Sequence, residues 1–115
     1  MSIKVYLDTS KTPPVTVNPS TENVNSGNQT VTWKPAANQP AFTFVGLTWW
    51  TTPNPFSAPS IQTDPVEMSI TEDNTAAGNY NYTITVAYNN QNYSSMVQPH
   101  PGFVGNGGTP TIHNN

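Results

Sequence analysis

The sequence predicts an all-β protein, an antiparallel Greek-key β-sandwich of about seven strands. Its apolar residues recur at every second position, which is the period of a half-buried strand, and no segment carries the period of an amphipathic helix. Turn-forming Pro, Asn and Gly residues separate the alternating segments at short intervals. A chain of 115 residues is long enough for one such core, so residues 1–115 are expected to form a single domain.

Four strands are predicted in the first half of the chain. Aliphatic side chains alternate with other residues over residues 3–7, which indicates a strand with one buried face. Residues 15–17 predict a short second strand, and the diproline before them suits an edge position. A third strand at residues 30–34 places Trp33 in the core. Residues 42–49 are apolar on both faces, which is typical of a central strand or of one whose outer face is covered.

The longest alternating segment lies in the second half. Residues 66–70 predict a half-exposed strand, and residues 80–88 predict the most regular strand of the chain. The Asn-rich segment 89–92 is expected to form a hairpin turn, because Asn tolerates left-handed backbone angles. Such a hairpin would bring Tyr88 and Tyr93 together as a cross-strand aromatic pair.

The C-terminal region continues this hairpin and then becomes irregular. The returning strand is expected at residues 93–97. A Gly- and Pro-rich segment at residues 98–108 follows it, and residues 109–113 are expected to add a last edge strand.

The charge composition excludes several classes of partner. Only 8% of the residues are charged, and the three lysines are scattered along a chain that has no arginine and a formal net charge of −3. Nucleic-acid binding needs clustered basic residues, so no nucleic-acid partner is expected. Binding to an anionic membrane surface is excluded for the same reason, and no segment has the length of apolar residues that spans a bilayer.

The chain contains no cysteine, so neither a disulfide nor a thiolate ligand nor a cysteine nucleophile is available. The N-terminal residues enter a strand pattern directly, without the apolar segment of a signal peptide. A cytoplasmic location is therefore expected for the chain as written. An extracytoplasmic location is expected instead if Met1 replaces a removed leader.

Two segments resemble known β-sandwich domains. Residues 31–34, Val-Thr-Trp-Lys, followed by the apolar residues from Phe42 to Leu47, resemble the strand pair that opens the core of cupredoxin-like domains. Residues 77–86, Ala-Gly-Asn-Tyr-Asn-Tyr-Thr-Ile-Thr-Val, are similar to a strand shared by many bacterial immunoglobulin-like and cupredoxin-like domains. The resemblance implies that Tyr80 ties the preceding corner to this strand through its hydroxyl group.

Copper binding does not follow from that resemblance. A blue-copper centre needs a Cys thiolate and two His ligands, and this chain has no Cys. Ala41 occupies the position before Phe42 where a first His ligand is expected, while His100 and His113 lie in a Pro/Gly segment and near the C-terminus. No metal and no other cofactor are therefore expected.

An aromatic patch is the best candidate for a binding site. Trp49 and Trp50 are adjacent, so on a regular strand they point to opposite faces, and Phe56 follows in a Pro-rich loop. These three residues form an exposed patch for a sugar or protein ligand, or else the loop folds back and Trp50 and Phe56 cap one open end of the core. The side chains of Asn81, Thr83 and Thr85 share one face of the long strand, where they either bind sugar hydroxyls or simply keep the surface soluble.

No catalytic site is expected. The carboxylates of Asp64, Glu67, Glu72 and Asp73 are interpreted as solvated turn and edge charges, because no basic residue lies near them in sequence. The predicted function is therefore non-catalytic recognition of a protein or carbohydrate. The alternative is a structural subunit that forms homo-oligomers through its weakly charged sheet faces or edges.

Overall fold

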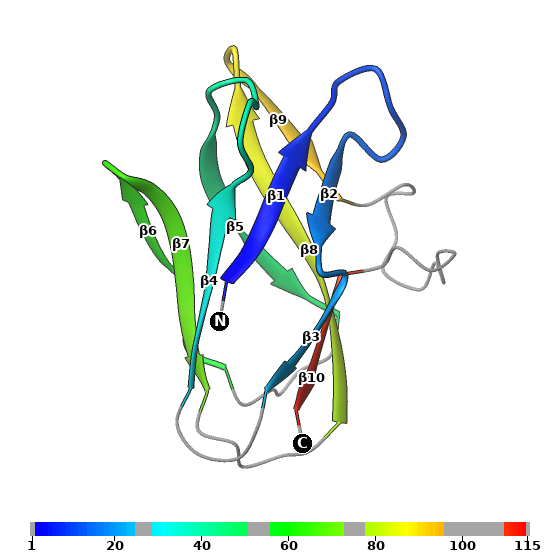
Figure 1. Cartoon of the computed structure of the whole chain (residues 1–115), viewed down its shortest axis with the longest axis vertical. Coiled ribbons are helices and arrows are strands. Elements are labelled where there is room, and N and C mark those ends of the chain that lie inside the picture. Colours follow the sequence, from blue (N-terminus) through cyan, green and yellow to red (C-terminus); the bar gives the residue numbers. More distant parts are fainter. Residues whose placement is uncertain (1, 25–28, 51–55, 73–77, 96–109, 115) are drawn as a thin grey trace.

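The computed structural model describes residues 2–24, 29–50, 56–72, 78–95 and 110–114, and these contain ten β-strands and no helix. The strands form two sheets, which Figure 1 shows as two layers. The first sheet has the order β2 (Val15–Asn18), β1 (Ser2–Leu7), β4 (Gln29–Pro35), β7 (Val66–Glu72) and β6 (Ser60–Thr63). The second has the order β3 (Thr21–Val24), β10 (Thr111–Asn114), β8 (Gly78–Tyr88) and β5 (Thr43–Trp49), and β9 (Gln91–Ser94) also pairs with β8.

The all-β prediction is confirmed, but the strand number and the strand directions differ from it. The described residues contain ten strands where about seven were expected, and the two that match no predicted segment, β3 and β6, are short and lack a clear apolar alternation. Both sheets are mixed, since β1 pairs with β4 and β3 pairs with β10 in parallel. The chain crosses from β2 in the first sheet to β3 in the second and then returns as β4 beside β1. A crossover of this kind makes a parallel neighbour where a hairpin would make an antiparallel one.

The core lies between the sheets and includes residues from both. Trp33 on β4 and Tyr82 on β8 are fully buried, and their rings meet edge to face with centroids 5.4 Å apart. The indole Nε1 of Trp33 donates a hydrogen bond of 3.0 Å to the Tyr82 hydroxyl. The predicted inward residues of β1, β2, β4 and β7 are also buried: Ile3, Val5, Leu7, Val15, Val17, Val31, Met68 and Ile70.

The predicted hairpin between β8 and β9 forms, but its loop is only Asn89 and Asn90, because Gln91 and Asn92, which were expected in the turn, belong to β9. Asn89 and Asn90 have φ angles of 53° and 64°. Positive φ at both loop positions is the requirement of the tight hairpin turn that matches strand twist, and Asn meets it at low cost. Tyr93 pairs with Val86 and Tyr88 pairs with Gln91, so the two tyrosines are diagonal neighbours on one face rather than directly opposite.

A β-bulge explains why β5 has apolar residues at both even-numbered and odd-numbered positions. The register with β8 shifts between Phe44 and Gly46, and the intervening Val45 is 45% exposed. Phe44 points into the core before the bulge, whereas Leu47 and Trp49 pack against the core after it. The side chains that face the core are therefore at even-numbered positions before the bulge and at odd-numbered positions after it. β5 is an edge strand in the described pairing, so the first of the two positions expected from its composition, a central one, is wrong, and the second, a strand with a covered outer face, stays a prediction.

The position of the last strand also differs from the prediction. β10 pairs with β3 on one side and with β8 on the other, so it lies inside its sheet and not at the edge. The expectation failed because β3, its partner on one side, was not predicted. The Gly- and Pro-rich segment 98–108 and the last residues of the predicted strand 93–97 lie outside the described residues.

No helix in the part of the chain that the structure describes has the length and hydrophobicity needed to cross a membrane.

Candidate functional site

Two of the three predicted patch residues pack on each other at the edge of the core. The rings of Trp49 and Phe56 are stacked, with centroids 4.3 Å apart and an interplanar angle of 12°. Trp49 also meets the ring of Tyr82 edge to face at 5.5 Å. Both residues are partly buried and pack against the hydrophobic core. The capping interpretation named Trp50 and Phe56, whereas the ring that stacks on Phe56 is that of Trp49.

Tyr80 joins the same aromatic cluster from β8. Its buried ring meets Phe56 edge to face, with centroids 5.3 Å apart. The nearby Gly78 has a φ of 144°, a backbone conformation that disfavours any residue with a side chain. The corner that the Tyr80 hydroxyl is predicted to tie, residues 73–77, lies outside the described residues, so that role stays a prediction.

Trp50 lies on the opposite, outward face of the second sheet. Its backbone N–H donates to the carbonyl of Asn81, which continues the β5–β8 ladder by one residue. Its indole Nε1 donates a hydrogen bond of 2.9 Å to Oγ1 of Thr83. Thr83 is only 7% exposed, while Trp50 itself stays partly exposed. The bond fixes the indole over the face that Asn81 and Thr83 share.

This outward face carries a continuous set of uncharged polar groups. The register places Asn81 opposite Thr111 and Asn79 opposite His113, with Thr83 and Thr85 further along β8. The strands β5, β8, β9 and β10 contain no Asp, Glu, Lys or Arg at any position. The sequence already suggested that Asn81, Thr83 and Thr85 share a face. The strand pairing adds Trp50, Thr111 and His113 to it, and together these residues are called the Trp50 face below.

Hydrogen bonds within the Trp50 face hold its amides in place. The hydroxyl of Thr111 donates to Oδ1 of Asn81 at 2.7 Å. The Nδ1 atom of His113 is hydrogen-bonded to Oδ1 of Asn79. In both asparagines the oxygen is therefore engaged with a neighbouring strand, which leaves the amide nitrogen as the donor end of the side chain. The face is pre-ordered before any ligand arrives.

The outward face of the first sheet is different because it is charged. Lys4 lies on β1, and Lys34 on β4 forms an ion pair of 3.5 Å with Glu67 on β7. The Glu67 carboxylate is thus held by a lysine, and Asp64 is exposed at the turn between β6 and β7. The two outward faces of the molecule therefore suit ligands of different charge.

The acidic and histidine side chains of the described residues do not gather into a metal site. No cluster of three His or acidic side chains suitable for a metal ion exists in that part of the chain. Glu72 is 2% exposed at the end of β7, where the sequence led us to expect a solvated loop charge, so that expectation was wrong. Asp73 and His100 lie outside the described residues.

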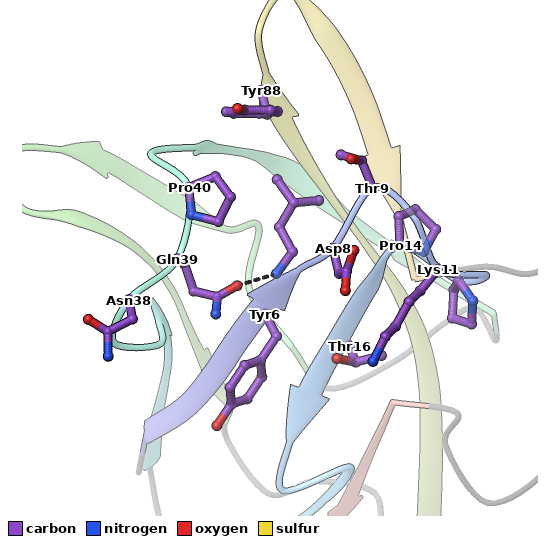
Figure 2. A pocket seen from close by; sticks show the side chains of 12 residues that line it. Tyr6, Asp8, Thr9, Lys11, Pro14, Thr16, Asn38, Gln39, Pro40 and Tyr88 are labelled. Carbon is purple, nitrogen blue, oxygen red and sulfur yellow. Dashed lines mark hydrogen bonds between the residues drawn. The ribbon is translucent and has the colours of Figure 1, made fainter.

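A cleft of about 400 Å³ opens at the end of the molecule where β1 and β8 finish. Figure 2 shows it between the loop that carries Asn38, Gln39 and Pro40 and the β1–β2 loop that carries Thr9, Lys11 and Pro14. Tyr88 and Tyr6 lie at opposite ends of this view. Sequence analysis did not find this cleft, since its walls come from segments that are about thirty residues or more apart in the chain and carry no shared motif.

No protein-family model matches this sequence, and no curated protein matches it significantly. Function is therefore inferred from this chain's own residues.

Proposed function

We propose that this protein is a non-catalytic recognition module that binds an uncharged carbohydrate chain on the Trp50 face. The observation that carries the proposal is the position of Trp50, a partly exposed indole anchored to Thr83 on a sheet face without charged side chains. Sugar rings present C–H faces that pack on aromatic rings, and they present hydroxyls that both donate and accept hydrogen bonds. The indole supplies the first contact, and the Asn and Thr side chains supply the second.

The absence of charge from these strands favours a neutral sugar over other ligands. A peptide or acidic polymer is normally recognised with the help of complementary charges. The Trp50 face has hydroxyls and amide nitrogens in a row from β8 to β10, which match the dense hydroxyl groups of a sugar chain.

We also propose that the fold is an immunoglobulin-like or cupredoxin-like β-sandwich. Two sheets around one shared core support a β-sandwich, and the resemblance of residues 77–86 favours an immunoglobulin-like or cupredoxin-like one. In such folds ligands are commonly bound on sheet faces or on the loops at either end, both of which are polar here.

Substitution of Trp50 tests the proposal directly. We expect Trp50→Ala to weaken retention on an array of neutral polysaccharides about fivefold or more, because one stacked aromatic contact is worth about 1 kcal/mol or more. Thr83→Val should weaken it less, since that variant keeps the indole and removes only its anchoring bond. Lys34→Ala, on the outward face of the other sheet, is the matched control and should bind normally. Unchanged retention by a correctly folded Trp50→Ala protein would refute the proposal.

Self-association is a second candidate function, and β6 is the observation that favours it. All four residues of this edge strand are exposed, none is charged or proline, and Ile61 is 40% exposed. Natural edge strands are usually protected by charge, proline or a covering segment, and an unprotected edge can pair with a second copy.

Opposite charges at Ile61 test this alternative. The unmodified chain should sediment as a dimer, and Ile61→Lys and Ile61→Glu should each sediment as monomers, because like charges meet at a two-fold axis. An equimolar mixture of the two variants should recover the dimer. A monomeric unmodified chain at micromolar concentration would exclude self-association through β6.

A further inference from the structure

The cleft at the end of β1 has a fixed shape. Its base includes Leu7, which is 4% exposed and whose backbone N–H donates to Oε1 of Gln39 at 2.7 Å. This bond ties the loop before β5 to the last residue of β1, and Figure 2 shows it as a dashed line. The two walls are therefore joined at the base of the cleft.

The opposite wall is braced by Asp8. The backbone N–H of Asp8 donates to the carbonyl of Pro14 at 2.8 Å, and that of Lys11 donates to the carbonyl of Asp8 at 3.1 Å. The backbone N–H and the hydroxyl of Ser10 both donate to Oδ1 of Asp8, at 3.0 and 2.6 Å. These side-chain and backbone bonds from Ser10 hold the pKa of Asp8 below its ordinary value, so its carboxylate is charged at neutral pH.

The chemistry of the lining is mixed. Tyr88 and Tyr6 contribute aromatic rings, Asp8 an anionic acceptor, and Asn38 an amide. Asn38 has a φ of 62°, so its loop turns sharply and places the residue beside the cleft. Lys11 balances the charge of Asp8 and lowers the Asp8 pKa further. The cleft is thus close to neutral, and its volume lies within the usual range of small-ligand sites, roughly 300–1,000 Å³.

We infer that this cleft is a second binding site, separate from the Trp50 face, which takes a single neutral sugar residue or the end of a sugar chain. Oδ1 of Asp8 is occupied by Ser10, so Oδ2 is the oxygen that accepts ligand hydroxyls. The ammonium group of Lys11 donates to another hydroxyl oxygen, and a tyrosine ring packs against the C–H face of the sugar.

A proline-rich peptide is the other ligand class that aromatic and proline rings can accept, and the donor and acceptor balance disfavours it. The backbone of a polyproline helix presents carbonyl oxygens and few N–H groups. Such a ligand would cover the Asp8 carboxylate without donating to it, and an anion that loses its solvent in this way is unfavourable. Each hydroxyl of a sugar ring both donates and accepts hydrogen bonds. A sugar can therefore donate to the Asp8 carboxylate and also accept from the Lys11 ammonium group.

Two conservative variants separate binding from folding. Asp8→Asn keeps an oxygen that accepts from Ser10 and replaces the other carboxylate oxygen by an N–H donor. Lys11→Met deletes the ammonium donor and keeps an unbranched side chain of similar length. Thr30→Ala, at an exposed position of β4 away from the cleft, is the control.

The experiment is an NMR titration of amide resonances with methyl glycosides of glucose, galactose and mannose. We expect saturable shifts of Leu7, Thr9 and Asn38 for one of them, a loss of affinity of about tenfold or more in each variant, and none in Thr30→Ala. The same shifts should persist in Trp50→Ala, which separates this inference from the function proposed for the Trp50 face.

Three outcomes would overturn it. The cleft residues do not shift with any of these glycosides, or the shifts occur only on the Trp50 face, or a proline-rich peptide shifts the cleft residues where the glycosides do not. The second outcome would leave the proposed function of the Trp50 face intact.

Discussion

The hydrogen bond between Trp33 and Tyr82 is the polar contact at the centre of the core. Both side chains are fully buried, so neither the indole N–H nor the phenol hydroxyl has water as an alternative partner. We expect Tyr82→Phe to lower the free energy of unfolding by about 1–3 kcal/mol, because it leaves the Trp33 N–H without an acceptor. Urea unfolding measures this. Tyr93→Phe, which removes an exposed bond to Gln91, should change stability by less than about 0.5 kcal/mol. Equal effects of the two changes would contradict the central role of this bond.

The same tyrosine makes stability depend on pH in the alkaline range. Burial raises the pKa of Tyr82 above its ordinary value. Above pH ~10 the unfolded chain loses the Tyr82 proton while the folded chain keeps it, so the folded state is progressively disfavoured by about 1.4 kcal/mol per pH unit. Below that pH both states keep the Tyr82 proton, so its ionisation does not change the free energy of unfolding. The difference in unfolding free energy between the unmodified protein and Tyr82→Phe should therefore shrink as the pH rises above 10, and a constant difference would be evidence against it.

The adjacent tryptophans should differ in what they contribute to stability. Trp49 is stacked on Phe56 and meets Tyr82, whereas Trp50 lies on the outward face. We expect Trp49→Ala to cost about 3 kcal/mol or more, as for other large aromatic truncations in a core, and Trp50→Ala to cost clearly less. Chemical unfolding of the two variants under one set of conditions gives the comparison. A larger loss for Trp50→Ala would show that Trp50, not Trp49, closes the core.

At the scale of elements, the bulge in β5 decides which of its residues are buried. Deleting Val45 removes the extra residue and joins Phe44 to Gly46, whose partners on β8 are consecutive, so Leu47 and Trp49 keep facing the core in a regular ladder. We therefore expect the deletion variant to fold. Deleting Thr48 instead reverses the side of the strand after that point, so it should turn Trp49 outward or make β5 slip against β8, and we expect it to cost several kcal/mol or to prevent folding. Circular dichroism and urea unfolding would compare the two deletions, and a Val45 deletion that failed to fold would show that the bulge itself is required.

The elements that the sequence predicted are those that bury one face over several residues. β1 and β8 alternate regularly because every second residue is in the core, so their faces follow from the pattern alone. β6 buries no residue and β3 buries only Val24. Neither strand therefore shows the alternation of apolar and polar residues that predicts a strand from sequence. The misplacement of β10 as an edge strand follows from the missing β3. Strand order depends on contacts between distant segments, and local periodicity carries little information about those.

The candidate site was predictable in part for the same reason. Opposite directions for Trp49 and Trp50 follow from the two-residue repeat, and so does the shared face of Asn81 and Thr83. That Trp50 lies on this face, with its indole bonded to Thr83, depends on the register between β5 and β8, and the bulge helps to set that register. The Figure 2 cleft depends on two loops brought together by the bond between Leu7 and Gln39, for which the sequence has no signal.

At the scale of the whole molecule, neither sheet has a core of its own. The buried side chains of each sheet pack against those of the other, as the contact between Trp33 and Tyr82 shows. The chain also crosses between the sheets, since β2 lies in the first and β3 in the second. With no cysteine available for a disulfide, the stability of both sheets depends on this one interface.

We therefore expect the protein to unfold in one cooperative step. The transition followed by sheet circular dichroism should coincide with that followed by tryptophan fluorescence, which reports on the core through Trp33 and through Trp49, and Trp49 remains as the reporter in Trp33→Phe. Trp33→Phe should shift both transitions together to a lower urea concentration, because it removes core volume and the bond to Tyr82 from the contact that both sheets share. If one sheet instead unfolded before the other, the two signals would separate, and the separation would widen in Trp33→Phe. Separate transitions would mean that each sheet is stabilised largely by contacts within itself, contrary to a single core between them.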